Sequence, residues 1–149
     1  MVTGIARQNV FAEKCEEVHT ALDPTTRENL VTAMHGEAFA YVKYMLFAEQ
    51  ARKNGNKKLA DLFEKTADVE RFEHFAEEAH LLGLVRGDIE NLADAIKGES
   101  YEIETMYVEF ARKAKLAGDL AAAARFEEIR HDEIGHRAAF VAELSKFPA

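Results

Sequence analysis

The chain has 149 residues, of which 48% are hydrophobic, and a formal net charge of −8. This length suffices for one hydrophobic core and is short for two ordinary domains. The acidic balance argues against nucleic acid and anionic membranes as partners, since both select clustered Lys and Arg. No apolar run approaches the roughly 18 residues of a membrane span, and no basic-then-apolar segment opens the chain, so we expect a cytoplasmic protein.

The predicted elements are all helical. An apolar period in residues 11–22 predicts a short helix, which makes residues 1–24 an N-terminal helical extension ended by Asp23-Pro24. Thr25-x-x-Glu28 resembles a capping box and predicts the start of a long helix that stops at Asn54-Gly55. Three further helices are expected at about 57–82, 88–117 and 119–145. Both prolines lie near the chain ends and no strand pattern occurs, so residues 25–149 predict an all-α domain with a four-helix core.

The helices repeat an internal pattern. GEAFAYVKYMLFAEQARKNG, from Gly36, resembles GESYEIETMYVEFARKAKLAG, from Gly98, and the likeness continues through the following helix of each pair. Two helical hairpins are therefore related by pseudo-symmetry. The second copy has one extra residue between Glu99 and Phe110, which predicts a π-bulge, a feature frequent at functional sites.

Carboxylates interrupt the apolar stripes of these helices. The stretch EEIRHDEIGHR holds two Glu-x-x-His patterns, Glu128/His131 and Glu133/His136, and both have the spacing of a metal-ligand pair. Glu133 and His136 fill a gap in the apolar stripe, whereas Glu128 points about 140° away from Glu133. The same test directs five more carboxylates inward, which are Glu37, Glu70, Glu73, Glu99 and Glu102.

Inward carboxylates need compensation, because buried charges of one sign repel one another and are poorly solvated. A pair of divalent or trivalent metal ions would balance six glutamates and a neutral imidazole. The alternative is that some of these glutamates lie on the surface of Glu-rich helices. Alignment of all of them under an internal repeat favours a dinuclear metal site.

These residues carry a family resemblance. Glutamates on two helices and Glu-x-x-His or its equivalent on two others resemble the ligand scheme of ferritin-like di-iron carboxylate proteins. Gly36-Glu37 with Tyr44, and GESYEIETMY, are similar to the erythrin domain of rubrerythrins and of short relatives such as sulerythrin and symerythrin, over about residues 28–144. The resemblance implies a ferritin-like four-helix bundle with metal ligands Glu37, Glu70, Glu99, Glu102, Glu133 and His136.

Two departures from the rubrerythrin pattern matter. Where rubrerythrins have a histidine three residues after the second-helix glutamate, this chain has Glu73, with His74 one position later. We therefore expect Glu73 to be a ligand and His74 to lie at the edge of the site as a further candidate. The chain also lacks the four-cysteine rubredoxin-like domain, since Cys15 is its single cysteine, so electrons must come from an external donor protein.

The resemblance predicts a non-haem oxidoreductase that reduces peroxide or dioxygen. Two iron ions are expected, although these ligands also suit manganese or a mixed pair, and Glu73 or Glu102 would change its coordination on oxidation. Tyr41, Tyr44 and Tyr107 would donate hydrogen bonds or be oxidised near the metals, the alternative for each being core packing. Two other functions stay open, namely iron handling by ferroxidase, storage or delivery, and a metal-stabilised bundle without turnover.

The linker between the hairpins predicts the assembly. In a ferritin-like bundle the second and third helices run parallel, so their connection must recross about 34 Å. Residues 83–87 span only about 20 Å when extended. We therefore expect a domain-swapped homodimer, in which Glu37 and Glu70 of one chain share metals with Glu99, Glu102, Glu133 and His136 of the other.

Overall fold

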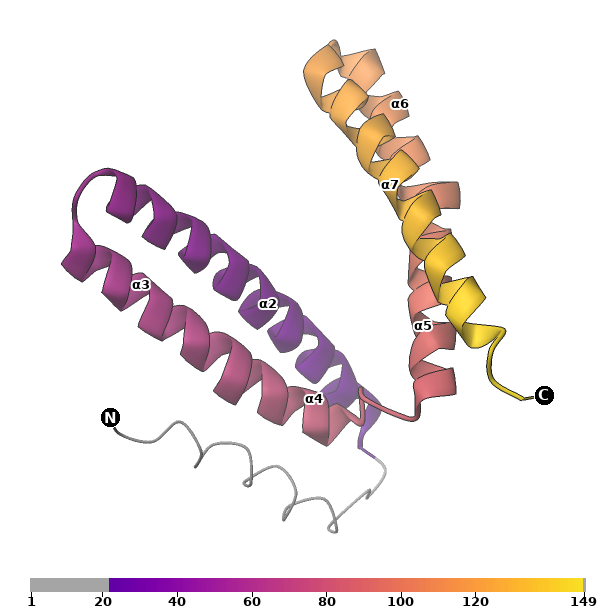
Figure 1. Ribbon diagram of the computed structural model, residues 1–149, viewed down its shortest axis with the longest axis horizontal. Coiled ribbons are helices and arrows are strands. Elements are labelled where there is room, and N and C mark those ends of the chain that lie inside the picture. The colour runs from indigo at the N-terminus through magenta and orange to yellow at the C-terminus, as the bar shows by residue number, and fades with distance from the viewer. Residues whose placement is uncertain (1–21, 149) are drawn as a thin grey trace. The chain divides into compact units, whose positions relative to one another are not determined.

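The computed structural model describes residues 22–148 (Figure 1). Its elements are α2 (Pro24–Lys53), α3 (Lys57–Val69), the π-helical segment η1 (Glu70–Phe75), α4 (Ala76–Leu82), α5 (Asp88–Tyr101), the π-helical segment η2 (Glu102–Met106), α6 (Tyr107–Ala117) and α7 (Leu120–Leu144). Every regular element within residues 22–148 is helical, which confirms the all-α prediction. The four long helices are also confirmed, because α3, η1 and α4 follow one another without a break, as do α5, η2 and α6. The predicted N-terminal helix falls on residues that lie mostly outside the described range.

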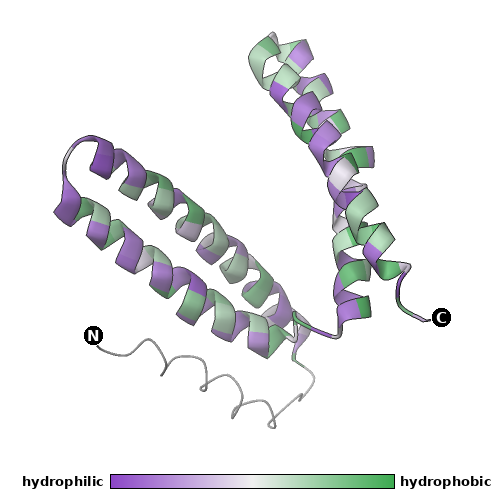
Figure 2. Ribbon diagram, in the orientation of Figure 1, coloured by the Kyte–Doolittle hydropathy of each residue, from purple (hydrophilic) through white to green (hydrophobic). Residues whose placement is uncertain are grey.

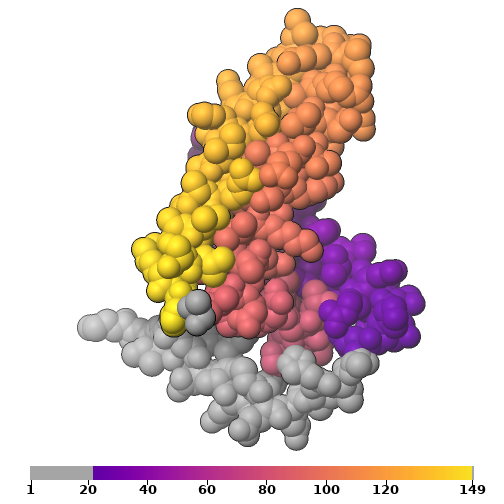
Figure 3. Space-filling view, turned by 90° about the vertical axis from the view of Figure 1, so that its right-hand side faces the viewer, coloured from indigo at the N-terminus to yellow at the C-terminus, as the bar shows by residue number. Residues whose placement is uncertain are grey.

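The chain divides into two compact units, one ending at Leu84 and the other beginning at Val85. Each is a helical hairpin. In the first unit, α2 packs along α3, η1 and α4. In the second, α5, η2 and α6 pack along α7, and Figure 3 shows α7 in yellow lying directly on its partner arm. The two turns contain Gly55 and Gly118, with φ of 75° and 85°, a left-handed conformation that glycine adopts without steric cost.

The start of α2 differs from the sequence prediction. The side chain of Asp23, not Thr25, caps the helix, and its Oδ1 accepts a hydrogen bond of 2.8 Å from the Thr25 amide. Pro24 takes the first helical position, where the missing N–H group would have no partner in any case. The helix therefore begins two residues earlier than a capping box at Thr25 would allow.

Both hairpins have small cores. The buried side chains in the described part of the chain are mostly alanines, such as Ala48 and Ala60 in the first unit and Ala111 and Ala123 in the second. Small residues let the two arms approach closely, but they leave larger apolar side chains such as Leu46, Leu62 and Leu120 more than half exposed. Figure 2 shows hydrophobic and hydrophilic residues interleaved along every helix. Each hairpin thus presents an apolar stripe that its own arms do not cover.

Two π-helical segments interrupt the long helices. The predicted π-bulge between Glu99 and Phe110 is confirmed as η2. A second segment, η1, lies within what the sequence predicts as one continuous helix over 57–82, so that part of the prediction was wrong. Among the residues described, no helix combines the length and hydropathy needed to cross a membrane.

Candidate metal centre

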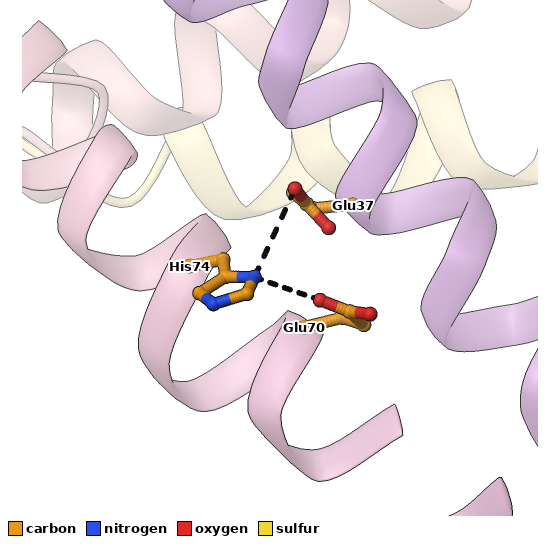
Figure 4. Close-up of side chains that lie close together, drawn as sticks. All are labelled: Glu37, Glu70 and His74. Atoms are coloured by element: carbon orange, nitrogen blue, oxygen red, sulfur yellow. Dashed lines mark ion pairs between the residues drawn. The ribbon is translucent and has the colours of Figure 1, made fainter. Parts of the chain in front are cut away.

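The first hairpin gathers Glu37 from α2 with Glu70 and His74 from η1 (Figure 4). His74 Nδ1 lies 2.8 Å from Glu70 Oε2 and 3.9 Å from Glu37 Oε1. The side chain of Glu70 is only 14% exposed, whereas that of His74 is 53% exposed. The carboxylates thus form the inner part of the cluster and the imidazole its outer edge.

The second hairpin gathers an equivalent set, Glu99 from α5 with Glu133 and His136 from α7. His136 Nδ1 lies 2.5 Å from Glu133 Oε2, and the two side chains are 60% and 14% exposed. In each set one oxygen or nitrogen atom per residue lies within 4.8 Å of the others. The internal repeat seen in the sequence is therefore a repeat of one Glu, Glu, His arrangement.

The π-helical segment η1 explains why the spacings of the two sets differ. Glu133 and His136 are three residues apart on a regular α-helix, whereas Glu70 and His74 are four residues apart. A π-turn holds one residue more than an α-turn, so it returns His74 to the face that carries Glu70. His74 was expected at the edge of the site as a further candidate ligand, and it lies on the exposed side of the cluster. The π-turn itself was not predicted, although the repeat offset indicates it, since the offset is 63 at Glu70/Glu133 and 62 at His74/His136.

The segment η2 compensates in the same way for an extra residue in the second hairpin. Tyr44 lies seven positions after Glu37, whereas Tyr107 lies eight positions after Glu99. The aromatic neighbours nevertheless match. The Tyr44 and Phe63 rings lie 6.1 Å apart, and the Tyr107 and Phe126 rings lie 6.2 Å apart. Both tyrosines therefore pack in aromatic clusters on the face that carries the carboxylates.

The remaining predicted residues lie in different surroundings. Glu102 is partly buried at the start of η2, where its charge acts on Glu99. Glu73 is exposed and lies outside the Glu37 cluster. The ring of Tyr41 lies under the guanidinium of Arg71, whose central carbon is 5.5 Å from the ring centre.

The register assigned to the last helix is reproduced by the structure. Glu128 is exposed and forms an ion pair of 3.1 Å with Arg125 on the surface of α7. His131 is also exposed. Of the two overlapping Glu-x-x-His patterns, only Glu133/His136 contributes to a cluster.

Burial and mutual repulsion perturb one carboxylate in each set. Burial raises the pKa of Glu37, and a hydrogen bond to Glu70 and the charge of Glu70 raise it further, while His74 partly opposes the shift. Burial likewise raises the pKa of Glu99, with Glu133 acting as Glu70 does and His136 opposing it. Without a cation, each pair of glutamates therefore shares a proton more readily than isolated carboxylates do.

Tyr107 is affected by the same charges. Burial raises the pKa of its hydroxyl, and the carboxylates of Glu102 and Glu133 raise it further. A phenol whose pKa lies above its usual value near 10 stays protonated at neutral pH. Its O–H group thus remains a hydrogen-bond donor beside the second carboxylate set.

The donor sets suit a metal ion. Carboxylate oxygens and imidazole nitrogens are the ligands that iron, manganese and other first-row divalent ions accept. Glu99 Oε2 is buried without a hydrogen-bond partner, as is Oε2 of Glu78, whose charge also raises the pKa of Glu37. Buried charged oxygens without partners are costly, and cations supply the missing interaction. The residues of both hairpins therefore fit metal binding.

Comparison with known proteins identifies the family. The rubrerythrin family model matches residues 28–144. Nigerythrin from Nitratidesulfovibrio vulgaris is 32% identical over 139 residues, which cover 84% of this chain and 68% of the relative. A rubrerythrin from the same organism is 34% identical over 129 residues, covering 78% of this chain and 67% of the relative. The chain thus spans about two thirds of the length of these curated relatives.

The solved structures give the same relatives. A structure of nigerythrin in its fully reduced, all-ferrous state aligns over 90% of this chain and 73% of its own, with 30% identity and a TM-score of 0.42. The chain belongs to the rubrerythrin family, whose members are ferritin-like di-iron oxidoreductases.

Proposed function

We propose that the protein is a di-iron oxidoreductase that reduces peroxide or dioxygen with electrons from an external donor protein. The observation that carries this proposal is the repeated Glu, Glu, His set, once in each hairpin. When bound, two ferrous ions supply the two electrons that peroxide takes up, with two protons, to form two water molecules, and they polarise the oxygen bond as Lewis acids.

The protein residues would hold the metals and manage protons. We propose that Glu37, Glu70 and His74 bind from the first hairpin, and that Glu99, Glu102, Glu133 and His136 bind from the second. His74 takes the place that the sequence analysis gave to Glu73, because it lies in the Glu37 cluster and Glu73 does not. The Tyr107 hydroxyl stays protonated and would donate a hydrogen bond to the bound oxygen substrate.

We further propose that two chains assemble as a domain-swapped homodimer. The helix bounds support the distances on which this proposal depends, because α4 ends 12 residues after Glu70 and α5 begins 11 residues before Glu99. Only residues 83–87 connect them. The exposed apolar stripe of each hairpin also requires cover from further helices. An exchanged hairpin provides that cover and completes the ligand set of each metal pair.

Anaerobic reoxidation tests the proposed reaction. The protein is loaded with two ferrous ions per chain, mixed with one equivalent of hydrogen peroxide or of dioxygen, and followed by its ferric absorption. Peroxide should reoxidise both irons within one turnover, and dioxygen more slowly. The Glu133→Ala variant should bind no metal pair, whereas Glu128→Ala should match the unaltered protein. Continued uptake of iron into a mineral would instead show iron storage.

A further inference from the structure

The π-helical segment η2 leaves one backbone carbonyl without its usual partner. The Tyr107 amide donates to the Glu102 carbonyl, five residues earlier, and not to the Ile103 carbonyl four residues earlier. Ile103 is only 3% exposed, so water is not readily available to this carbonyl. A buried backbone carbonyl needs a hydrogen-bond donor from elsewhere in the protein.

Arg130 of α7 is that donor. Its Nε donates to the Ile103 carbonyl over 2.7 Å, across the hairpin. Arg130 lies three residues before the proposed ligand Glu133, and Arg137 lies four residues after it. Arg137 Nη1 donates to Glu104 Oε1 over 2.7 Å, also within η2. Helix α7 therefore contacts η2 through two arginines, one before and one after Glu133 in the sequence.

The first hairpin has no arginine at the equivalent position, and its π-helical segment η1 lies on the other arm. At the position that the repeat pairs with Arg130 stands Ala67, which is fully buried. The arm of α2 that faces Ala67 is a regular helix throughout. Of the two hairpins, the one with the arginine is thus the one whose facing arm carries a π-bulge, as expected if the arginine serves as donor to the carbonyl that the bulge frees.

We propose that Arg130 is a positioning residue of the metal site. By bonding to the Ile103 carbonyl it holds η2 in the π-helical register. That register keeps Glu99, before the bulge, and Tyr107, after it, on one face of the arm. If η2 reverted to a regular helix with the same residues, these two side chains would turn by about 100° relative to each other. This inference rests on the proposed function, because it assigns Arg130 a role at the proposed metal site.

Cobalt(II) titration of the full-length protein tests the role of Arg130. Cobalt(II) accepts the same ligands, and its visible absorption reports the geometry of the site. Arg130→Met keeps a long side chain but removes the N–H donor. It should weaken cobalt binding roughly 10- to 100-fold, the range for residues that orient metal ligands. It should also change the visible spectrum and speed hydrogen exchange at the Tyr107 amide. Arg130→Lys should restore most of the affinity. Arg125→Met, on the exposed side of α7, is the matched control and should change neither property.

A second pair of variants isolates the carbonyl. Deletion of Thr105 removes the extra residue of η2, so the segment should become a regular helix in which each backbone carbonyl has an amide partner. No free carbonyl then remains to accept a hydrogen bond from Arg130. In that background Arg130→Met should leave cobalt affinity unchanged. An equal loss of affinity with and without Thr105 would overturn the inference, as would an Arg130→Met protein that melts earlier but keeps its cobalt affinity and spectrum. Failure of the unaltered protein to bind cobalt would instead refute the proposed metal site.

Discussion

Deleting Glu73 tests whether η1 is a one-residue insertion that brings His74 into the site. Without Glu73, the sequence after Glu70 reads Arg-Phe-His, and the histidine stands three residues from the glutamate. This is the spacing of Glu133 and His136 in the other hairpin, where the helix is regular. We expect η1 to become α-helical and the Glu37, Glu70, His74 set to persist.

The expected magnitudes follow from helix geometry. Deleting a residue from a regular helix turns everything behind it by about 100° and shifts it by about 1.5 Å. In η1 the extra residue already accounts for that rotation, so α4 should keep its packing on α2. The free energy of unfolding should change by about 1 kcal/mol or less, which is a shift of roughly 2–4 °C in melting temperature for a chain of this size.

The matched control is deletion of Gly135 from the regular helix α7. It would place His136 about 100° away from its present direction and turn Phe140 by the same amount. We expect loss of metal and destabilisation by about 2–5 kcal/mol, the usual cost of removing a large apolar side chain from its packing.

Metal content by plasma mass spectrometry and thermal unfolding by circular dichroism measure both deletions. The Glu73→Ala variant separates the role of the side chain from that of the helix register. If the deletion removes the metal and Glu73→Ala keeps it, the register explanation is refuted. If both remove the metal, Glu73 is itself a ligand.

Three other predictions concern ligands, protons and assembly. Glu99→Ala should empty the site, whereas His131→Ala should leave metal content within error by the same assay, and the reverse result would show that the helix register is misassigned. For the metal-free protein, the raised folded pKa values of Glu37 and Glu99 mean that the folded state binds more protons than the unfolded chain. This contribution to stability is fully present below the unfolded pKa and is lost as pH rises through the folded pKa values, so the melting temperature should fall over that interval. The fall should be less steep in a Glu37→Gln, Glu99→Gln variant, and equal slopes in the two proteins would contradict this prediction. Glu37→Ala and Glu133→Ala chains that are unfolded, mixed and refolded should give heterodimers with one intact site and half the normal metal content. A fully metallated monomer in light scattering would exclude the swap.

The helices could be predicted from the sequence because apolar residues recur at helical spacing and glycines mark the turns. The inward direction of Glu37, Glu99 and Glu133 was predicted from the same periodicity, since Glu37 and Glu133 each fill a gap in an apolar stripe and Glu99 continues one. The π-bulge η2 could be inferred from one extra residue in the repeat. His74 lies at the exposed edge of its cluster, as expected, but the π-turn η1 was not predicted, because the single-residue change of repeat offset between Glu70 and His74 was not recognised.

The contacts of Arg130 could not be predicted in the same way. A side-chain bond from one helix to the backbone of another depends on which carbonyl the bulge frees and on how far the arms are apart. Periodicity gives neither quantity. The exposed position of Glu73 also follows from the π-turn, which moves it off the face that a regular helix would give it.

The positions of η1 and η2 also bear on how the chain evolved. Although the hairpins repeat one another, η1 lies on the second arm of the first hairpin and η2 on the first arm of the second. A single ancestral hairpin that already carried either bulge would have passed it to the same arm in both copies. The simplest history is one duplication followed by two separate single-residue insertions. Each insertion was confined to one helical turn. A ligand spacing that differs between the two hairpins is therefore explained by an insertion and not by loss of the site.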